Sequence, residues 1–166
     1  MANVGDAYQH GPEDILVGAP FTTSGGNAYL YLGNVGGAPT LDTTFSSSQS
    51  GARFGYSVCG GSQSGTPTVI MGAPYYTTTV MPSGTQMPRA GAAFLFAYIS
   101  GQWTYSGGVG GSYTNDNCGY SVDYVQQVTS TASGSSSGFI VGVPNQHDMR
   151  TGQPMGGGAS VSYYTP

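Results

Sequence analysis

Charge is what this sequence has least of. Charged residues make up 6% of its 166 residues, against roughly 25% in an ordinary soluble domain. There is no lysine, and the formal net charge is -4. Nucleic acid binding depends on clustered lysine and arginine, so the composition argues against a nucleic acid partner. The surface must be built from Ser, Thr, Gly, Asn, Gln and Tyr, which favours a secreted, extracellular or cell-surface location.

Long apolar runs and cysteines are also scarce. No stretch approaches the roughly 20 apolar residues that a membrane-spanning helix needs, so we predict no membrane span. No Asn-x-Ser/Thr sequence is present, and N-glycosylation is not expected. The two cysteines, Cys59 and Cys118, allow at most one internal disulfide. We expect them instead to be two small, buried, apolar side chains.

Signals for helices and for catalysis are nearly absent. No stretch keeps apolar residues at helical spacing for three turns. Short runs rich in Val, Ile, Tyr, Phe and Thr, bounded by Gly and Pro, occur throughout and predict an all-β fold. There is no His-Glu-x-x-His sequence, no cysteine pair at zinc spacing and no phosphate-binding glycine loop. We therefore predict that the chain is not an enzyme.

Short sequence elements recur in a fixed order along the chain. They are an FGYSV-type element (54–58 and 118–122), a GAP-type strand (14–20, 68–74 and 138–144), a GxA-type strand (26–32, 91–97 and 158–164) and a fourth strand (40–46 and 102–108). Four short strands in each repeat are typical of a propeller blade. A single blade cannot bury both faces, so neighbouring blades stack to form a continuous core.

At these residues the chain resembles the FG-GAP repeat family, which forms the blades of the integrin α-subunit propeller. The segment "SQSGARFGYSVCG…TVIMGAP…GAAFLFAY" carries almost the whole repeat. The third copy departs from it, with Cys118 in place of the Phe and Val143 in place of the Ala. The resemblance covers most of residues 3–164 and implies a β-propeller built from four-stranded antiparallel blades.

The number of elements predicts about three blades in one domain, residues 1–166. The blades span 3–48, lacking its first strand; 49–110, complete; and 111–166, lacking its last strand. This gives ten strands, whereas propellers typically close with four to eight blades. We therefore expect a partial propeller that further copies of the chain, or further blades of a longer chain, complete. A lone compact monomer is not expected.

The resemblance also implies a calcium loop between the FG-type and GAP-type strands. In the first repeat this window is "DAYQHGPED", 6–14, where Asp6 and Asp14 match but Tyr8 and His10 occupy two ligand positions. Calcium takes six to eight oxygen ligands, and neither replacement supplies a carboxylate. Asp6 and Asp14 thus remain candidate ligands of a degenerate calcium loop, and no other cofactor is expected. The corresponding windows of the other repeats are expected to be hydrogen-bonded turns without an ion: residues 60–68 and 123–138.

Two places are candidates for ligand contact. Tyr75 and Tyr76 begin a long connection, 75–89, and loop tyrosines amid Ser and Gly are typical of binding surfaces; ordinary edge packing is the alternative. His147 and Asp148 form a polar cluster after the third GAP-type strand, for which a solvated turn is the alternative.

The function expected from these features is a non-catalytic extracellular module for adhesion or for binding a protein or glycan. The alternative is a structural subunit of a surface assembly, such as a filament, coat or multimeric propeller.

Overall fold

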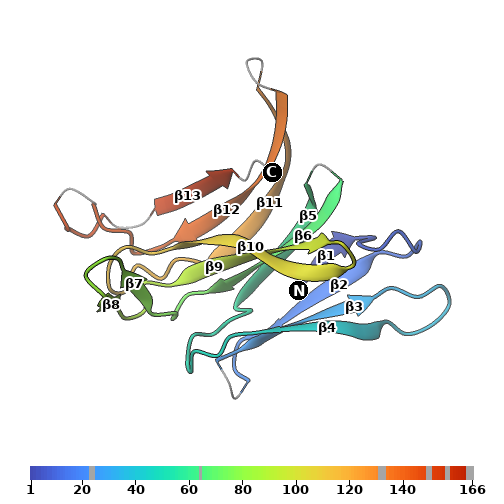
Figure 1. The fold of residues 1–166 in the computed structure, drawn as a ribbon, viewed down its shortest axis with the longest axis horizontal. Helices are drawn as coiled ribbons and strands as arrows, with labels where there is room; N and C mark the ends of the chain where they lie inside the picture. The colour runs from blue at the N-terminus through green and yellow to red at the C-terminus, as the bar shows by residue number, and fades with distance from the viewer. Residues whose placement is uncertain (23–24, 64, 131–133, 149–150, 156–157, 164–166) are drawn as a thin grey trace.

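A computed structural model describes residues 1–22, 25–63, 65–130, 134–148, 151–155 and 158–163 (Figure 1). All of the regular structure in these residues is β-strand, which confirms the all-β prediction. The strands form two four-stranded sheets, one three-stranded sheet and one separate hairpin, all antiparallel. None of the described residues belongs to a helix that could span a membrane.

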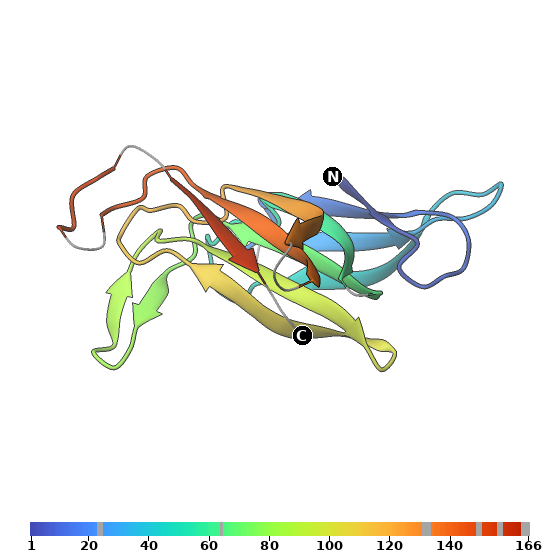
Figure 2. The ribbon, with the colours of Figure 1, turned by 90° about the horizontal axis from the view of Figure 1, so that it is seen from above.

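Each sheet is a run of strands that are mostly consecutive in the sequence. The first sheet has the order β1 (Ala2–Gly5), β2 (Asp14–Ala19), β3 (Asn27–Leu32) and β4 (Thr40–Ser46). The second has the order β5 (Ser57–Gln63), β6 (Thr66–Ala73), β9 (Ala92–Ile99) and β10 (Gln102–Gly110). The third has the order β11 (Ser121–Ser130), β12 (Gly134–Val143) and β13 (Gly158–Tyr163). The hairpin of β7 (Thr78–Val80) and β8 (Thr85–Met87) lies between β6 and β9 and projects from the second sheet (Figure 2).

The first sheet corrects the prediction that residues 3–48 lack their first strand. Residues Ala2–Gly5 form β1, which pairs antiparallel with β2. The sequence did not reveal this strand because it is short and does not carry the FGYSV pattern. The prediction of ten strands was therefore wrong, since β1 and the hairpin within 75–89 add to it. In the third sheet, the described residues supply three strands, as expected.

The FGYSV-type elements lie mostly before the strands that they were expected to form. Phe54 to Tyr56 make a turn, with the Tyr56 N–H donating to the Arg53 carbonyl oxygen, and β5 begins only at Ser57. The windows 60–68 and 123–138 also differ from the prediction. They are hairpins, β5–β6 and β11–β12, rather than turns alone. The first window, by contrast, is an open loop between β1 and β2.

The three sheets stack one on another through their neighbouring faces (Figure 1). Strand β1 contacts β5, and β5 contacts β11, so the first strands of the sheets lie side by side. Two apolar clusters fill the spaces between sheets. The cluster between the first and second sheets includes Leu16, Leu30, Phe54, Val69 and Met71. The cluster between the second and third includes Cys59, Ile70, Leu95, Phe139 and Val141.

Paired glycines explain why the FG and GAP elements recur together. A Cβ atom on Gly18 would lie 1.9 Å from the carbonyl oxygen of Gly55, and one on Gly72 would lie 2.0 Å from that of Gly119. Each pair joins the GAP-type glycine of one sheet to the FG-type glycine of the next. Only residues without a Cβ allow two backbones to come this close. The two sheet interfaces are therefore built from the same contact.

Candidate functional site

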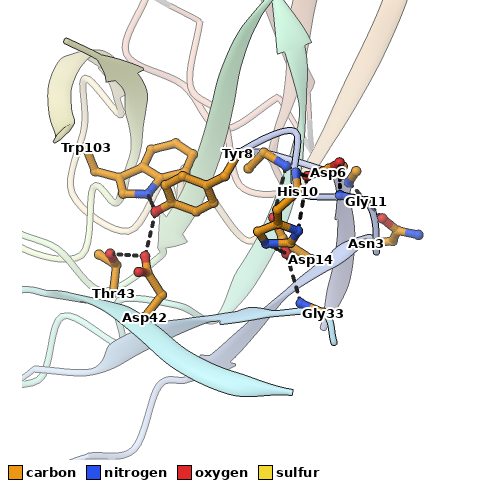
Figure 3. A network of polar contacts seen from close by, with 12 residues as sticks. Asn3, Asp6, Tyr8, His10, Gly11, Asp14, Gly33, Asp42, Thr43 and Trp103 are labelled. Atoms are coloured by element: carbon orange, nitrogen blue, oxygen red, sulfur yellow. Dashed lines mark hydrogen bonds and ion pairs between the residues drawn. The ribbon is translucent and has the colours of Figure 1, made fainter. Parts of the chain in front are cut away.

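The loop between β1 and β2 is organised around the side chain of Asp6 (Figure 3). Its carboxylate accepts hydrogen bonds from the backbone N–H of His10, at 2.9 Å, and of Gly11, at 2.7 Å. Desolvation acts to raise the pKa of Asp6, but these amide hydrogen bonds and the nearby His10 hold it below its ordinary value of 3.8. The Asp6 side chain thus closes the loop on itself, as aspartate commonly does in turns.

Asp14 ties this loop to the first sheet. It stands at the start of β2 and is fully buried. Its Oδ2 accepts the N–H of Ala7 at 2.9 Å, and its Oδ1 accepts the N–H of Gly33 at 2.9 Å. A buried carboxylate needs such donors, because an unsatisfied buried charge is costly. Asp14 therefore joins the β1–β2 loop to the end of β3.

His10 lies between the two carboxylates. Its Nδ1 is 3.4 Å from Asp6 Oδ1, and its Nε2 is 3.3 Å from Asp14 Oδ1. Within the described part of the chain, these are the three metal-ligating side chains whose donor atoms come within 4.8 Å of one another. The structure thus brings together both residues that were predicted as calcium ligands, with an imidazole added between them.

This set of side chains does not fit calcium. Both oxygens of Asp6 and both oxygens of Asp14 already accept backbone N–H groups. The nearby Glu13 carboxylate accepts a hydrogen bond from the Asn3 side chain. Calcium requires six to eight oxygens, whereas the loop centre offers two carboxylates and a nitrogen ligand. The His10 imidazole already lies between the two carboxylates, where an ion would have to sit.

Tyr8 occupies the other altered ligand position, and its side chain points away from the loop centre (Figure 3). Its hydroxyl donates to Asp42 Oδ2 at 2.5 Å and accepts from Trp103 Nε1 at 2.8 Å. Its ring packs edge-on against Tyr98, with centroids 4.6 Å apart. Desolvation and the hydrogen bond to Asp42 raise the pKa of Tyr8 to about 12. Tyr8 therefore fastens the first sheet's loop to the β9–β10 hairpin of the second sheet.

His147 is held by a residue that the sequence did not connect with it. Its Nδ1 is 2.6 Å from Oδ1 of the buried Asp116, and its ring lies 5.3 Å from that of Tyr113. Asp116 also accepts the backbone N–H groups of Ser112 and Tyr113. The predicted partner Asp148 lies in the following turn, where its carbonyl oxygen accepts the N–H of Gly152 at 2.7 Å. His147 therefore supports the β10–β11 connection, beside a cavity of about 110 Å³.

Tyr75 and Tyr76, predicted as a pair, have different surroundings. Tyr76 packs edge-on against Phe94, with centroids 5.1 Å apart, at the margin of the first core. Tyr75 instead makes cation–π contacts with two guanidinium groups. The Cζ atom of Arg53 is 3.9 Å from the centre of its ring, and that of Arg89 is 4.9 Å away. Tyr76 also lines a cavity of about 150 Å³, whereas Tyr75 lies beside charged groups.

The arginines at Tyr75 belong to a cluster that we call the arginine–tyrosine patch: Phe21, Arg53, Tyr75 and Arg89. Arg53 also lies 5.1 Å from the centre of the Phe21 ring, so it bridges two aromatic side chains. Phe21 and Tyr75 follow the ends of β2 and β6, and Arg53 and Arg89 precede the starts of β5 and β9. The sequence named Tyr75 but gave no reason to place the arginines beside it, because their proximity depends on how the sheets stack.

The two cysteines are buried and are not joined by a disulfide, which confirms the prediction. Burial raises the pKa of both thiols, that of Cys118 to about 12. Such thiols remain protonated at neutral pH and are poor nucleophiles and metal ligands. They act as small core side chains.

A comparison with protein-family models finds no match to this chain, and a comparison with curated proteins finds none either. The likeness to FG-GAP repeats therefore depends on the repeated sequence elements themselves.

Proposed function

We propose that the chain is a set of FG-GAP-type propeller blades that acts as a non-catalytic binding or adhesion module. The repeated glycine contact supports the blade arrangement, because Gly18 with Gly55 and Gly72 with Gly119 stack successive sheets in the same way. The contacts of β1 with β5 and of β5 with β11 give the side-by-side first strands that a propeller requires.

The observation that carries the binding function is the arginine–tyrosine patch. Aromatic and arginine side chains dominate the energetics of binding surfaces, and here they gather at the ends of strands from two sheets. Side chains at such loop clusters commonly carry function, while the sheets position them. The scarcity of charge elsewhere supports an extracellular or cell-surface location. The ligand class is a protein or a glycan.

An array of glycans, together with a pull-down from cell-surface extracts, tests the binding function. We expect the wild-type chain to retain a ligand and a Tyr75→Ala variant to lose most of it. Tyr105→Phe is a suitable control, since Tyr105 is an exposed tyrosine outside the patch. If the wild-type chain bound nothing on the array or in the extracts, the result would contradict the proposed function.

A structural subunit of a surface assembly is the second candidate, and one sheet face favours it. In the first sheet, Ile15 pairs with Tyr31 and Val17 pairs with Tyr29. These residues alternate with the buried Leu16, so they share the face turned away from the second sheet, where they remain half-buried. Further copies of the chain, or further blades, could cover this apolar face. Electron microscopy distinguishes the candidates, because uniform isolated particles at micromolar concentration would exclude an assembly.

A further inference from the structure

The arginine–tyrosine patch concentrates positive charge in an acidic chain. The sequence has three arginines and no lysine, and two of the arginines lie over one ring, that of Tyr75. The distance between the two Cζ atoms is therefore at most the sum of their distances to the ring centre, 3.9 Å and 4.9 Å. Two like charges this close repel each other, and their cation–π contacts with Tyr75 hold them together.

No carboxylate of the described residues offsets the repulsion between Arg53 and Arg89. The ion pairs in this part of the chain involve His10 and His147, not Arg53 or Arg89. Arg89 is exposed, and Arg53 is half-buried. The guanidinium N–H groups of both arginines therefore remain available to an anion from outside the chain.

The turn itself does not explain why Arg53 is an arginine. Arg53 has φ = 58°, and Asn117, at the equivalent position of the next repeat, has φ = 56°. Asparagine suits this conformation, and the Asn117 side chain also donates to the Pro74 carbonyl oxygen and accepts from Asn145. Arg53 adopts the same strained backbone without such bonds. Residues in this region of φ often cluster at ligand-binding sites.

The surroundings of the arginines indicate the class of ligand. A guanidinium group forms paired hydrogen bonds with a carboxylate or with the oxygens of a sulfate. Phe21 is 76% exposed beside Arg53, and its ring offers an apolar surface for the C–H face of a sugar. Two arginines are too few for a nucleic acid, which needs many phosphate contacts. A stable interface with a folded protein normally buries about 800 Å² on each side, more than a patch of four residues supplies.

We propose that the arginine–tyrosine patch binds an acidic glycan, a saccharide whose carboxylate or sulfate group lies against Arg53 and Arg89. This inference rests on the proposed binding function and names its ligand class. Arg53 and Arg89 bind the anionic group, Tyr75 holds the two guanidinium groups in place, and Phe21 supports the neighbouring sugar ring.

Isothermal titration calorimetry with defined probes tests this inference. The probes are tetragalacturonate, its methyl ester and a sulfated galactotetraose, which separate carboxylate from sulfate and from neutral sugar. We expect at least one anionic probe to bind and the methyl ester to bind at least about tenfold more weakly, since it keeps the sugar but loses the charge. Higher salt should weaken the binding of the anionic probe.

Two variants and one control link the binding to the patch. Arg53→Asn copies the residue of the equivalent turn and so keeps the fold, and Arg89→Gln removes the second charge. Each should weaken binding of the anionic probe about tenfold. Arg150→Gln, which removes the third arginine of the sequence, should leave it unchanged. Circular dichroism of each variant verifies folding.

Three results would overturn the inference. They are equal binding of the ester and the acid, unchanged binding in both patch variants, and binding of a polyglutamate peptide in place of every saccharide. If the array or the extracts still yield a ligand in such a case, the proposed binding function stands and only its ligand class is wrong. If nothing binds in any of these experiments, both are wrong.

Discussion

At the scale of the residue, Tyr8 and His10 occupy ligand positions in the loop where the FG-GAP resemblance implies calcium. The Tyr8 side chain turns outward and packs against Tyr98 and Trp103 of the second sheet. The imidazole of His10 lies between the carboxylates of Asp6 and Asp14. Tyr8 and His10 thus supply contacts that hold this loop closed.

The raised pKa of Tyr8 predicts a loss of stability in alkali. In the unfolded chain this hydroxyl ionises near 10, whereas in the folded protein its pKa is about 12. The contribution of the Tyr8 hydroxyl to the free energy of unfolding is complete below pH 10 and is lost as the pH rises through 12. Urea unfolding should show a steeper fall in the free energy of unfolding over this range for the wild type than for Tyr8→Phe.

The same variant should be less stable by about 1 kcal/mol at pH 8, because it removes the hydrogen bond to Asp42. Tyr105→Phe provides the control, since Tyr105 is exposed and its hydroxyl is outside this network. If the free energy of unfolding varied with pH in the same way for the wild type and for Tyr8→Phe, the Tyr8 hydroxyl would not stabilise the fold.

At the scale of the element, the three windows that precede the GAP-type strands have different structures. The first is an open loop fixed by Asp6 and Asp14, and the others are the β5–β6 and β11–β12 hairpins. Antiparallel strands need only a tight turn between them, so no ion is required to order the two hairpins.

Calcium should therefore have little effect on the stability of the β1–β2 loop. We expect millimolar Ca²⁺ to change the melting temperature by less than about 1 °C, because an ion bound weakly at this concentration adds little free energy. Differential scanning fluorimetry with and without a chelator measures this change. A rise of several degrees that Asp6→Asn abolishes would show that the loop is a calcium site.

The glycine contact between sheets predicts a severe effect of a single methyl group. Gly18→Ala and Gly72→Ala each place a Cβ atom about 2 Å from a backbone oxygen, which cannot move without separating the sheets. Each should cost at least about 3 kcal/mol, at the upper end of overpacking effects. Thermal unfolding or solubility on expression provides the measurement.

Gly36→Ala is the matched control for these variants. Nothing lies within 4 Å of a Cβ atom at Gly36, although its φ is 72°, so this variant reports backbone strain alone, about 1 kcal/mol. If Gly18→Ala cost no more than Gly36→Ala, the sheets would have to stack more loosely than the structure shows.

At the scale of the whole molecule, the three sheets form a stack whose first sheet turns a half-buried apolar face away from the second sheet. Tyr29 and Tyr31 lie on that face with Ile15 and Val17. Exposed apolar faces of this kind commonly mark contact surfaces, and low surface charge does little to prevent association.

We therefore expect the isolated chain to associate. Light scattering should give a mass above the 16.9 kDa of one chain, and Tyr29→Glu should reduce it by placing a charge on the open face. Val35→Glu is the control, because Val35 is 85% exposed in the β3–β4 connection. A wild-type chain that remains a folded monomer on dilution and on concentration would contradict this prediction.

The sequence by itself determined the β-structure, the order of the repeats and the burial of Cys59 and Cys118. These properties follow from local patterns: alternation, Gly and Pro boundaries, and repetition of the same elements. The sequence did not reveal β1, because its four residues carry no repeated motif. It also did not reveal the hairpins in the windows 60–68 and 123–138, because polar Ser and Gly residues suit a hairpin as well as a turn.

Only the tertiary structure decided which distant residues meet. It placed Asp116 against His147 and set Arg53 and Arg89 over Tyr75. It also turned Tyr8 away from the loop where the pattern implied a ligand. These contacts depend on how one sheet is positioned on the next, and that position is fixed by glycine pairs and core packing between segments far apart in the sequence. No local pattern encodes such a geometry.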